Sequence, residues 1–234
     1  HGSEHSFPTR RSSDLIQDDA FIEKMVAKYP KLLATLPSKE SGVRYRLEGY
    51  LFPATYGYGK NSKMEDLVDQ MLAAMDQNLS AYYDTMEAKN IDVNEALTLA
   101  SLIEKEGATD KDRKDIASVF YNRLNQDMPL QSNIAILYAQ GQLGKKTTLK
   151  EDATIDTNID SPYNIYKNTG LMPGPVDSPG VSAIEAAVNP SKTDYLYFVA
   201  NVETGEVYFA KTYEEHTKNV EEHVNSKLTE SSSN

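Results

Sequence analysis

The sequence predicts an α+β domain that is mostly helical and ends in a β-hairpin. Apolar residues recur every three or four positions in several segments between residues 21 and 140, which is the helical period. Aromatic and β-branched residues alternate over 195–211 around a turn that contains Gly205, a pattern typical of a hairpin. Residues 147–179 are rich in Asp, Asn, Thr, Pro and Gly, yet apolar enough to predict a long ordered loop.

The N-terminal segments are predicted to be helices separated by a shaped loop. Phe21–Leu36 has helical spacing that is interrupted near Pro30. Arg46–Tyr58 is aromatic and contains Gly and Pro, which predicts an irregular loop. Met64–Asn78 is an amphipathic helix, and Leu79–Lys89 continues it either as an extension or as a second helix.

A helix over Val93–Glu106 has clear predicted boundaries. Asp92 with Glu95 forms a capping box at its start, and Gly107 ends it. Four further helices are predicted: Asp110–Asn125, Ile134–Gln140, Ser182–Val188 and Tyr213–Leu228. Asp110 is a candidate cap for the first, Gly141 ends the second and Pro190 ends the third.

The composition restricts the function classes. The chain has 234 residues, a formal net charge of −11, no cysteine and no apolar run of ~18 residues. The charge argues against a nucleic-acid surface and a polybasic membrane patch. Residues 1–15 resemble a tag or a sequence scar, and we expect them and the tail 231–234 to be disordered. We expect a single domain over 16–230, with a helical N-terminal part (16–90) and a core part (91–230).

Two glutamates lie near the end of the helix that Gly107 terminates, which is apolar almost all the way round. At about 100° per residue, Glu106 shares a face with Leu102, whereas Glu104 lies about 160° away. A narrow polar arc of this helix includes Thr98. The two acids therefore cannot act side by side as a dyad.

Glu106 is the better candidate for a proton donor. A carboxyl among apolar groups has a raised pKa, which a general acid requires. Glu106 is also in the last turn, where the negative end of the helix dipole opposes ionisation by up to ~1 kcal/mol. The alternative is that both acids are ordinary, one solvated and the other in an ion pair with Arg113 or Arg123.

Amides, hydroxyls and tyrosines gather around candidate acids in several loops. Amides bind sugar hydroxyls and tyrosine rings offer flat faces to sugars, and the chain has fifteen tyrosines against six phenylalanines. These side chains are candidates for a polysaccharide cleft: Glu48, Tyr50, Gln131, Ser132, Asn133, Tyr163, Asn164 and Tyr166. The alternatives are a helix cap at Ser132 or Asn133 and a hydrogen bond within the loop at Asn164.

Other chemistries have weak support. His216 and His223 lie seven residues apart, roughly on one helix face, but without a third ligand nearby, which favours a solvated face over a metal site. No glycine-rich phosphate loop precedes a helix, and neither a serine nucleophile elbow nor a cysteine is present. We therefore expect neither a metal nor a cofactor.

Seven blocks occur in a characteristic order: Glu48–Tyr56, Ala100–Glu106, Val119–Leu124, Met128–Ser132, Ser161–Tyr166, Gly170–Pro175 and Tyr195–Val199. Together they resemble the endolytic murein transglycosylases of the MltG (YceG-like) family, in a Gram-positive, streptococcal-like version. The resemblance covers roughly Ile16 to Leu228. One departure is at Asn133–Ala135, where many relatives have Asp-Pro-Thr, so that an acid is missing here.

The resemblance implies a reaction. Family members cut the β-1,4 bond between N-acetylmuramic acid and N-acetylglucosamine in nascent glycan strands, which terminates strand elongation. The muramic C6 hydroxyl attacks its own C1 and leaves a 1,6-anhydro end. One carboxyl suffices, since it first protonates the leaving oxygen and then accepts the hydroxyl proton. The catalytic residue of the family corresponds to Glu106, with Glu104 in support.

The resemblance also implies a setting for that reaction. We expect a lysozyme-like catalytic core, the long loop over its cleft, and the candidate cleft residues in contact with substrate. Peptidoglycan strands are the expected partner, with cell-wall synthesis or division proteins as further ones. We expect action at the extracytoplasmic face of the membrane, through an anchor that is not in this chain. Two alternatives remain: a peptidoglycan-binding or division-scaffold module with little activity, and hydrolysis with Glu104 or an Asp as partner.

Overall fold

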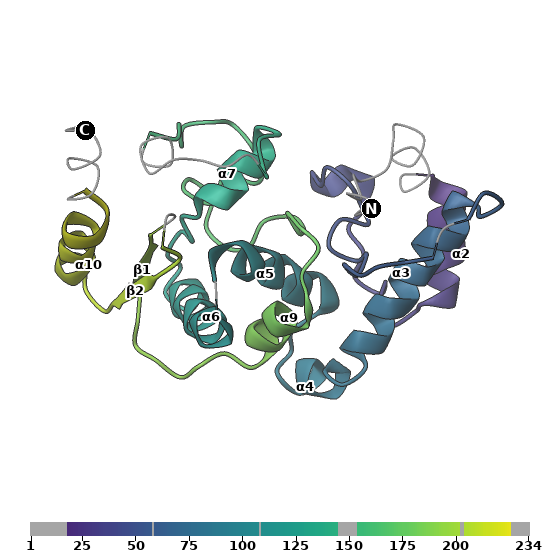
Figure 1. Ribbon diagram of the computed structural model, residues 1–234, viewed down its shortest axis with the longest axis horizontal. Coiled ribbons are helices and arrows are strands. Elements are labelled where there is room, and N and C mark those ends of the chain that lie inside the picture. Colours follow the sequence, from purple (N-terminus) through teal and green to yellow (C-terminus); the bar gives the residue numbers. More distant parts are fainter. Residues whose placement is uncertain (1–17, 58, 108, 145–153, 202–203, 226–234) are drawn as a thin grey trace.

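The computed structural model describes residues 18–57, 59–107, 109–144, 154–201 and 204–225 (Figure 1). It is an α+β structure, in which helices surround a helical centre and one two-stranded antiparallel sheet lies near the C-terminal end. The predicted fold class is therefore confirmed at this level. The predicted disordered segments, 1–15 and 231–234, lie outside the described residues.

Helix α5 (Val93–Glu106) is the centre of the structure and packs against α6 (Asp110–Leu124) and α9 (Val181–Val188) (Figure 1). Its predicted bounds and its capping box are both confirmed, since Asp92 accepts from the Glu95 amide at 2.8 Å and donates its own amide to the Glu95 carboxylate at 3.0 Å. The helix is buried from Ala96 to Ile103.

The polar arc predicted on α5 is exposed at Glu95 and Lys105, near its two ends, and buried between them. Thr98 and Ser101 have no exposed surface, and the Ser101 hydroxyl donates to the Thr98 carbonyl at 2.7 Å and accepts from the Val176 amide at 3.0 Å. The loop that contains Val176 therefore covers this side of the helix, and the serine satisfies one of its backbone amides.

The N-terminal part contains α2 (Asp19–Lys28), a short 3-10 helix (Lys39–Ser41), α3 (Met64–Leu79) and α4 (Tyr83–Ala88). The helix predicted up to Leu36 thus ends at Lys28. Proline disfavours the helical conformation of the residue before it, and Tyr29 accordingly has φ −121° and ψ 63°. Within the predicted segment Leu79–Lys89, a separate helix, α4, forms over Tyr83–Ala88 and does not extend α3.

Helices α6 and α7 (Asn133–Ala139) are both capped by hydroxyl side chains at their starts. Thr109, and not the expected Asp110, caps α6, because its hydroxyl accepts from the Asp112 amide at 3.1 Å. Ser132 caps α7 by accepting from the Ile134 amide at 3.2 Å, which confirms the capping alternative for this residue.

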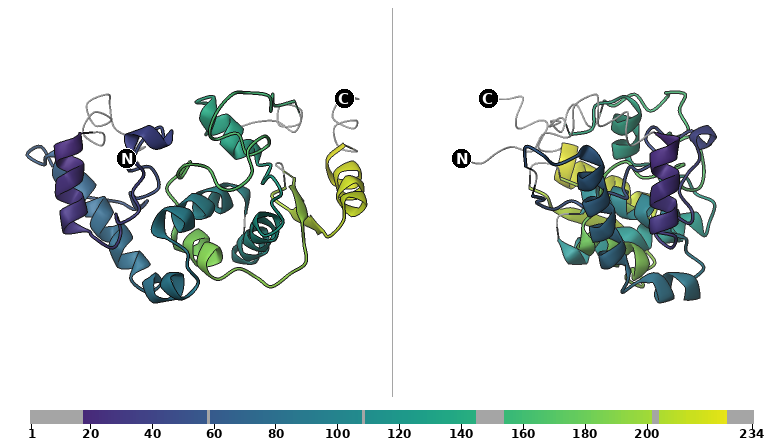
Figure 2. Two further views of the ribbon diagram at one scale, coloured as in Figure 1. Left: turned by 180° about the vertical axis from the view of Figure 1, so that it is seen from behind. Right: turned by 90° about the vertical axis from the view of Figure 1, so that its right-hand side faces the viewer.

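The predicted hairpin is confirmed. Strand β1 (Tyr197–Ala200) pairs antiparallel with β2 (Val207–Ala210), with Tyr197 opposite Ala210. Helix α10 (Tyr213–Val220) packs on both strands and continues into a π-helical turn (Glu221–Asn225). The hairpin and α10 lie at one end of the molecule, and α2 and α3 lie at the other (Figures 1 and 2).

The described part of the predicted long loop, residues 154–179, contains no helix or strand. It is ordered all the same, because Tyr163, Asn164, Ile165, Met172 and Val176 in it are buried. In the described ranges, no helix is long and apolar enough to cross a membrane.

Arg123 joins the hairpin to the helical centre. It is 6% exposed, and it donates to the carbonyl oxygens of Leu196 at 2.6 Å and Pro129 at 2.8 Å. We expect Arg123→Met to lower the free energy of unfolding by about 3 kcal/mol, because buried acceptors lose their donors. Urea denaturation measures this loss. Lys111→Met on the same helix is the control: its side chain is 82% exposed, so its effect should stay within about 0.5 kcal/mol. Equal effects would contradict the prediction.

Candidate active site

Glu106 lies at the last position of α5, next to the start of α7. The Ser132 hydroxyl donates to its carboxylate Oε1 at 2.7 Å, and the same hydroxyl accepts from the Ile134 amide. A hydroxyl can donate and accept at once, so Ser132 both caps α7 and orients the Glu106 carboxyl. Glu106 is partly exposed, whereas the helix before it is buried. A partly exposed carboxyl at the end of a well-packed helix can reach a bound molecule.

Gly107 ends α5 for a reason that the sequence did not indicate. Its φ is −105°, so the chain does not enter the left-handed conformation of the usual glycine cap. A Cβ at this position would lie 2.7 Å from Cγ of Arg113. The glycine is therefore required by the close approach of Arg113 to the residue that ends α5.

Glu104 has a different set of partners from Glu106. Its Oε2 accepts from the Gly180 amide at 3.0 Å, at the start of α9, and its Oε1 lies 3.5 Å from the Arg113 guanidinium. The two acids thus point to different elements, as the helix geometry predicts. The expected ion pair with an arginine is present at Glu104, which therefore ties α5 to α6 and α9.

A second carboxyl, that of Glu48, lies at the other end of α7. The Tyr138 hydroxyl donates to Glu48 Oε2 at 3.4 Å. Arg44 makes two hydrogen bonds close to this contact. Its backbone amide donates to the Tyr163 hydroxyl at 3.3 Å, and its guanidinium donates to the Tyr138 carbonyl at 3.0 Å. The rings of Tyr138 and Tyr163 lie 4.8 Å apart. A glutamate carboxyl is therefore in contact with each end of α7: that of Glu106 with Ser132, and that of Glu48 with Tyr138.

The surroundings of Glu48 favour its neutral form. Burial, and second the negative charge of Asp177, raise the pKa of Glu48 to about 7. Asp177 itself forms an ion pair with Lys105 at 2.7 Å, and Lys105 precedes Glu106 in α5. Through this pair, the loop beside Glu48 also contacts the end of α5.

The other predicted site residues fall into two groups. Asn133 and Tyr166 lie beside Ser132, and the Tyr166 hydroxyl donates to Asn133 Oδ1 at 2.6 Å. Gln131 is exposed, and its Oε1 accepts from Arg123 at 3.1 Å. These residues therefore lie at or next to the start of α7, where Ser132 contacts Glu106.

Tyr50 and Asn164 lie in the interior. Tyr50 has no exposed surface, and its hydroxyl donates to Asn94 Oδ1 at 3.2 Å. Asn164 is 1% exposed and donates to the carbonyls of Thr157 and Ile159, at 3.0 and 2.7 Å, which is the alternative of a hydrogen bond within the loop. The structure therefore does not bring these two side chains to the surface beside Glu106.

The sequence-based prediction did not include Arg44, Tyr138 or Asp177. Tyr138 contacts Glu48 across 90 residues, and Arg44 contacts Tyr163 across 119 residues. The sequence contains no signal for such pairs, because the contacts depend on how the loops pack on α7.

The two histidines that follow the hairpin pack on its tyrosines and do not form the fully solvated face expected for them. His216 stacks on Tyr197, with ring centres 5.3 Å apart, and His223 stacks on Tyr208 at 3.6 Å. Burial lowers the pKa of His216. Within the part of the chain that the structure describes, no three His, Cys, Asp or Glu side chains could hold a metal ion.

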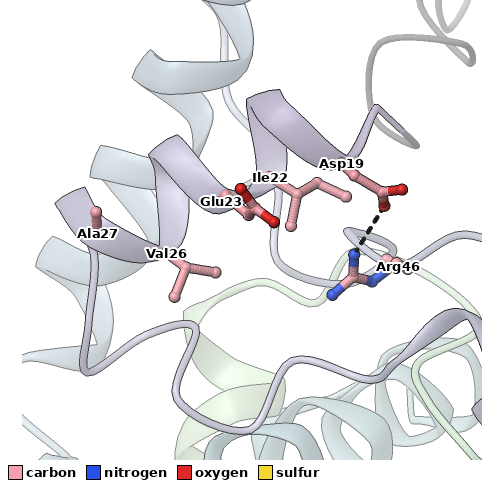
Figure 3. Close-up of a pocket in the computed structure, with 6 residues that line it drawn as sticks. All are labelled: Asp19, Ile22, Glu23, Val26, Ala27 and Arg46. Carbon is pink, nitrogen blue, oxygen red and sulfur yellow. Dashed lines mark ion pairs between the residues drawn. The ribbon is translucent and has the colours of Figure 1, made fainter.

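A hollow of about 340 Å³ lies between α2 and the loop that contains Arg46 (Figure 3). Neither Glu106 nor Glu48 lines it. Arg46 points across it and pairs with Asp19 at 3.6 Å. None of the residues that line it is a predicted site residue.

Comparison with known proteins identifies the family. Residues 8–222 match the YceG-like family. The chain belongs to the YceG-like family. It is 66% identical over 213 residues to the endolytic murein transglycosylase of Streptococcus pneumoniae, and 43% identical over 213 residues to that of Bacillus subtilis. These matches cover 91% of the chain but only 39% and 57% of the relatives, so the chain spans about two fifths of the first relative and somewhat over half of the second.

A solved structure agrees with the fold of this member of the YceG-like family. The crystal structure of a YceG-like protein from Listeria monocytogenes superimposes with a TM-score of 0.78 at 44% sequence identity. The match covers 89% of this chain and 66% of the Listeria chain. The two proteins therefore share their overall fold.

Proposed function

We propose that this chain is the catalytic domain of an endolytic peptidoglycan transglycosylase, with Glu106 as its general acid and base. The observation that carries the proposal is the position of the Glu106 carboxyl, which lies at the end of a buried helix and accepts from the Ser132 hydroxyl at 2.7 Å. Ser132 orients it, while Glu104 is engaged by the Gly180 amide and by Arg113. The relatives named endolytic murein transglycosylase support the same reaction.

A single carboxyl is enough for this reaction. Protonated Glu106 donates its proton to the oxygen between N-acetylmuramic acid and N-acetylglucosamine as the C1–O bond breaks. The resulting carboxylate then accepts the proton of the muramic C6 hydroxyl, which bonds to C1 and closes the 1,6-anhydro ring. The Ser132 hydroxyl holds the carboxyl in place through both steps, and the enzyme ends the cycle protonated again.

The substrate lies along α7 in this proposal. Asn133, Gln131 and Tyr166 receive the sugars near Glu106, whereas Ser132 is buried and holds the Glu106 carboxyl. Glu48 lies toward the other end of the helix. We further propose a lysozyme-like core with residues 154–179 over the cleft. The location that follows is the outer face of the bacterial membrane, with nascent glycan strands as substrate and cell-wall synthesis or division proteins as neighbours.

Product analysis tests the proposal. The protein is incubated with un-crosslinked glycan strands, and the ends are identified by chromatography and mass spectrometry. We expect internal cleavage that leaves 1,6-anhydro-muramic ends without reducing muramic ends. A parallel lysozyme digest, which leaves reducing ends, is the reference. Reducing ends would mean hydrolysis with a second acid, and intact strands that still bind would mean a binding module; either result would overturn the proposal.

A further inference from the structure

The segment between α6 and α7 (Figure 1) ends in a turn, residues 129–131, that leads directly into Ser132. Its last residue, Gln131, has φ +58°, the left-handed conformation that residues with a side chain rarely adopt. Such a conformation is strained and persists only where the surrounding structure holds it. Because Ser132 follows Gln131, whatever holds this conformation also sets the direction in which the chain enters α7.

Two contacts from other elements, the loop 154–179 and α6, hold Gln131 in this conformation. Its backbone amide donates to the Ile165 carbonyl at 3.0 Å, and its side-chain Oε1 accepts from Arg123 Nη1 at 3.1 Å. The same nitrogen of Arg123 also donates to the carbonyl oxygens of Pro129 at 2.8 Å and Leu130 at 3.2 Å. One buried guanidinium on α6 therefore contacts all three residues of the turn.

The orientation of Arg123 is itself fixed by the hairpin. Its Nε donates to the Leu196 carbonyl at 2.6 Å, and its guanidinium lies 5.0 Å from the centre of the Tyr197 ring. An aromatic ring on one face and hydrogen bonds in the plane restrict a guanidinium to one orientation. The turn is therefore held by a buried group that is fixed in place, and not by a mobile surface side chain.

Ser132 transmits the position of the turn to Glu106. It is 3% exposed, and its Oγ accepts from the Ile134 amide at 3.2 Å, which leaves its proton for Glu106 Oε1, 2.7 Å away. A serine side chain is short, so a change in the backbone of Gln131 would carry this hydroxyl away from the carboxyl.

We infer that the left-handed turn at Gln131 positions the general acid, with Gln131 and Arg123 as positioning residues that act through Ser132. The inference rests on the proposed function for the role of Glu106 in the reaction, although the position of Ser132 is measured without turnover. Since Arg123 also bonds to the Leu196 carbonyl, one buried side chain connects the hairpin with the acid.

Gln131→Pro should release the turn from within. Proline fixes φ at about −65° and has no amide proton, so both the left-handed conformation and the bond to Ile165 are lost. A crystal structure of this variant should show Ser132 Oγ beyond hydrogen-bond distance of Glu106 Oε1, whereas the two atoms are 2.7 Å apart in the wild type. We expect kcat for the release of anhydro ends to fall about tenfold, through the loss of one hydrogen bond to the acid.

Gln131→Gly separates the backbone of this residue from its side chain. Glycine adopts a positive φ without a steric cost, so Ser132 should stay in contact with Glu106 and kcat should fall less than about threefold. The missing amide should weaken glycan binding, measured as Kd by calorimetry, as much as in Gln131→Pro. A loss of kcat in Gln131→Gly equal to that in Gln131→Pro would overturn the inference, because the side chain and not the conformation would then act.

A double-mutant cycle tests whether the turn acts through Ser132. Ser132→Ala should lower kcat about tenfold, and Gln131→Pro or Arg123→Met added to it should lower kcat by no more than about twofold further. Arg123→Met releases the turn from outside, and it keeps the inference testable if Gln131→Pro does not fold. Losses of kcat that multiply would mean that the turn acts on another group, which would also overturn the inference.

Asn90→Pro is the matched control for Gln131→Pro. Asn90 has φ +55° and its amide also makes a backbone hydrogen bond at 3.0 Å, but it precedes α5 at the end opposite to Glu106. Thr212→Ala, which removes the cap of α10, is the control for the cap of α7 that is lost in Ser132→Ala. Each control should lose stability and keep kcat within about twofold of the wild type. Circular dichroism checks that each variant is folded.

The results that contradict the inference differ from those that contradict the proposed function. The inference fails if Ser132 stays within hydrogen-bond distance of Glu106 in folded Gln131→Pro and Arg123→Met, or if Asn90→Pro lowers kcat as much as Gln131→Pro does. A wild type that leaves reducing ends, or intact strands, would instead contradict the proposed reaction. The position of Ser132 in the variants would then still decide whether the turn orients it.

Discussion

Glu106→Gln is expected to lower kcat for the release of anhydro ends by about 10³-fold, with little change in glycan affinity. An amide cannot donate a proton to the leaving oxygen or accept one from the C6 hydroxyl, and loss of general acid–base catalysis costs about 10²- to 10⁴-fold. The amide oxygen can still accept from Ser132, so the geometry of the site should remain. Kinetics on un-crosslinked strands, with calorimetric binding on the same variant, measures both quantities.

Glu104→Gln is the matched control on the same helix. Its amide oxygen can still accept from the Gly180 amide, but it loses the charge that faces Arg113. We expect a loss of stability of about 1 kcal/mol and a loss of kcat below tenfold. If Glu104→Gln abolished activity as Glu106→Gln does, the reaction would use two carboxyls, and the products should then be reducing ends.

Gly49→Ala is expected to lower the free energy of unfolding by more than about 3 kcal/mol. Gly49 has φ +79°, and a left-handed conformation costs an alanine about 1 kcal/mol. The added Cβ would lie 2.3 Å from Cβ of Pro175, so the loop that carries Asp177 would have to move. The larger share of the loss comes from this contact, because packed segments yield only at a cost of about 1–3 kcal/mol. Urea denaturation measures the loss.

Gly170→Ala separates the two costs. Gly170 has φ +85°, close to that of Gly49, but nothing lies within 4 Å of its added Cβ. We expect a loss of only about 1 kcal/mol there. Equal losses at the two positions would mean that conformation alone explains Gly49.

The helices that the sequence predicted well are those whose boundaries depend on local contacts. The capping box of Asp92 and Glu95 uses groups three residues apart, and the bounds of α5 are correct at both ends. The hairpin around Gly205 is correct for the same reason. The start of α6 shows the limit of this approach, since Thr109 and Asp110 are both suitable caps and only the backbone conformation distinguishes them.

Patterns along one helix were less reliable where distant segments cover it. Thr98 and Ser101 form a polar arc in the sequence, but the loop with Val176 buries them. Gly107 resembles an ordinary helix stop, whereas its lack of a side chain accommodates Arg113. In both places the deciding partner comes from another part of the chain.

The sequence alone determined the separation of the two acids, because helix geometry places residues 104 and 106 on opposite faces whatever packs around them. Together with the family motifs, it also selected Glu106. Only the tertiary structure decided what holds each acid: Ser132 for Glu106, and Gly180 and Arg113 for Glu104. It also placed Glu48 against Tyr138 and Asp177. The reason is physical, since a local pattern fixes a side chain's direction on its helix, whereas its charge state and partners depend on burial and on groups far away in the sequence.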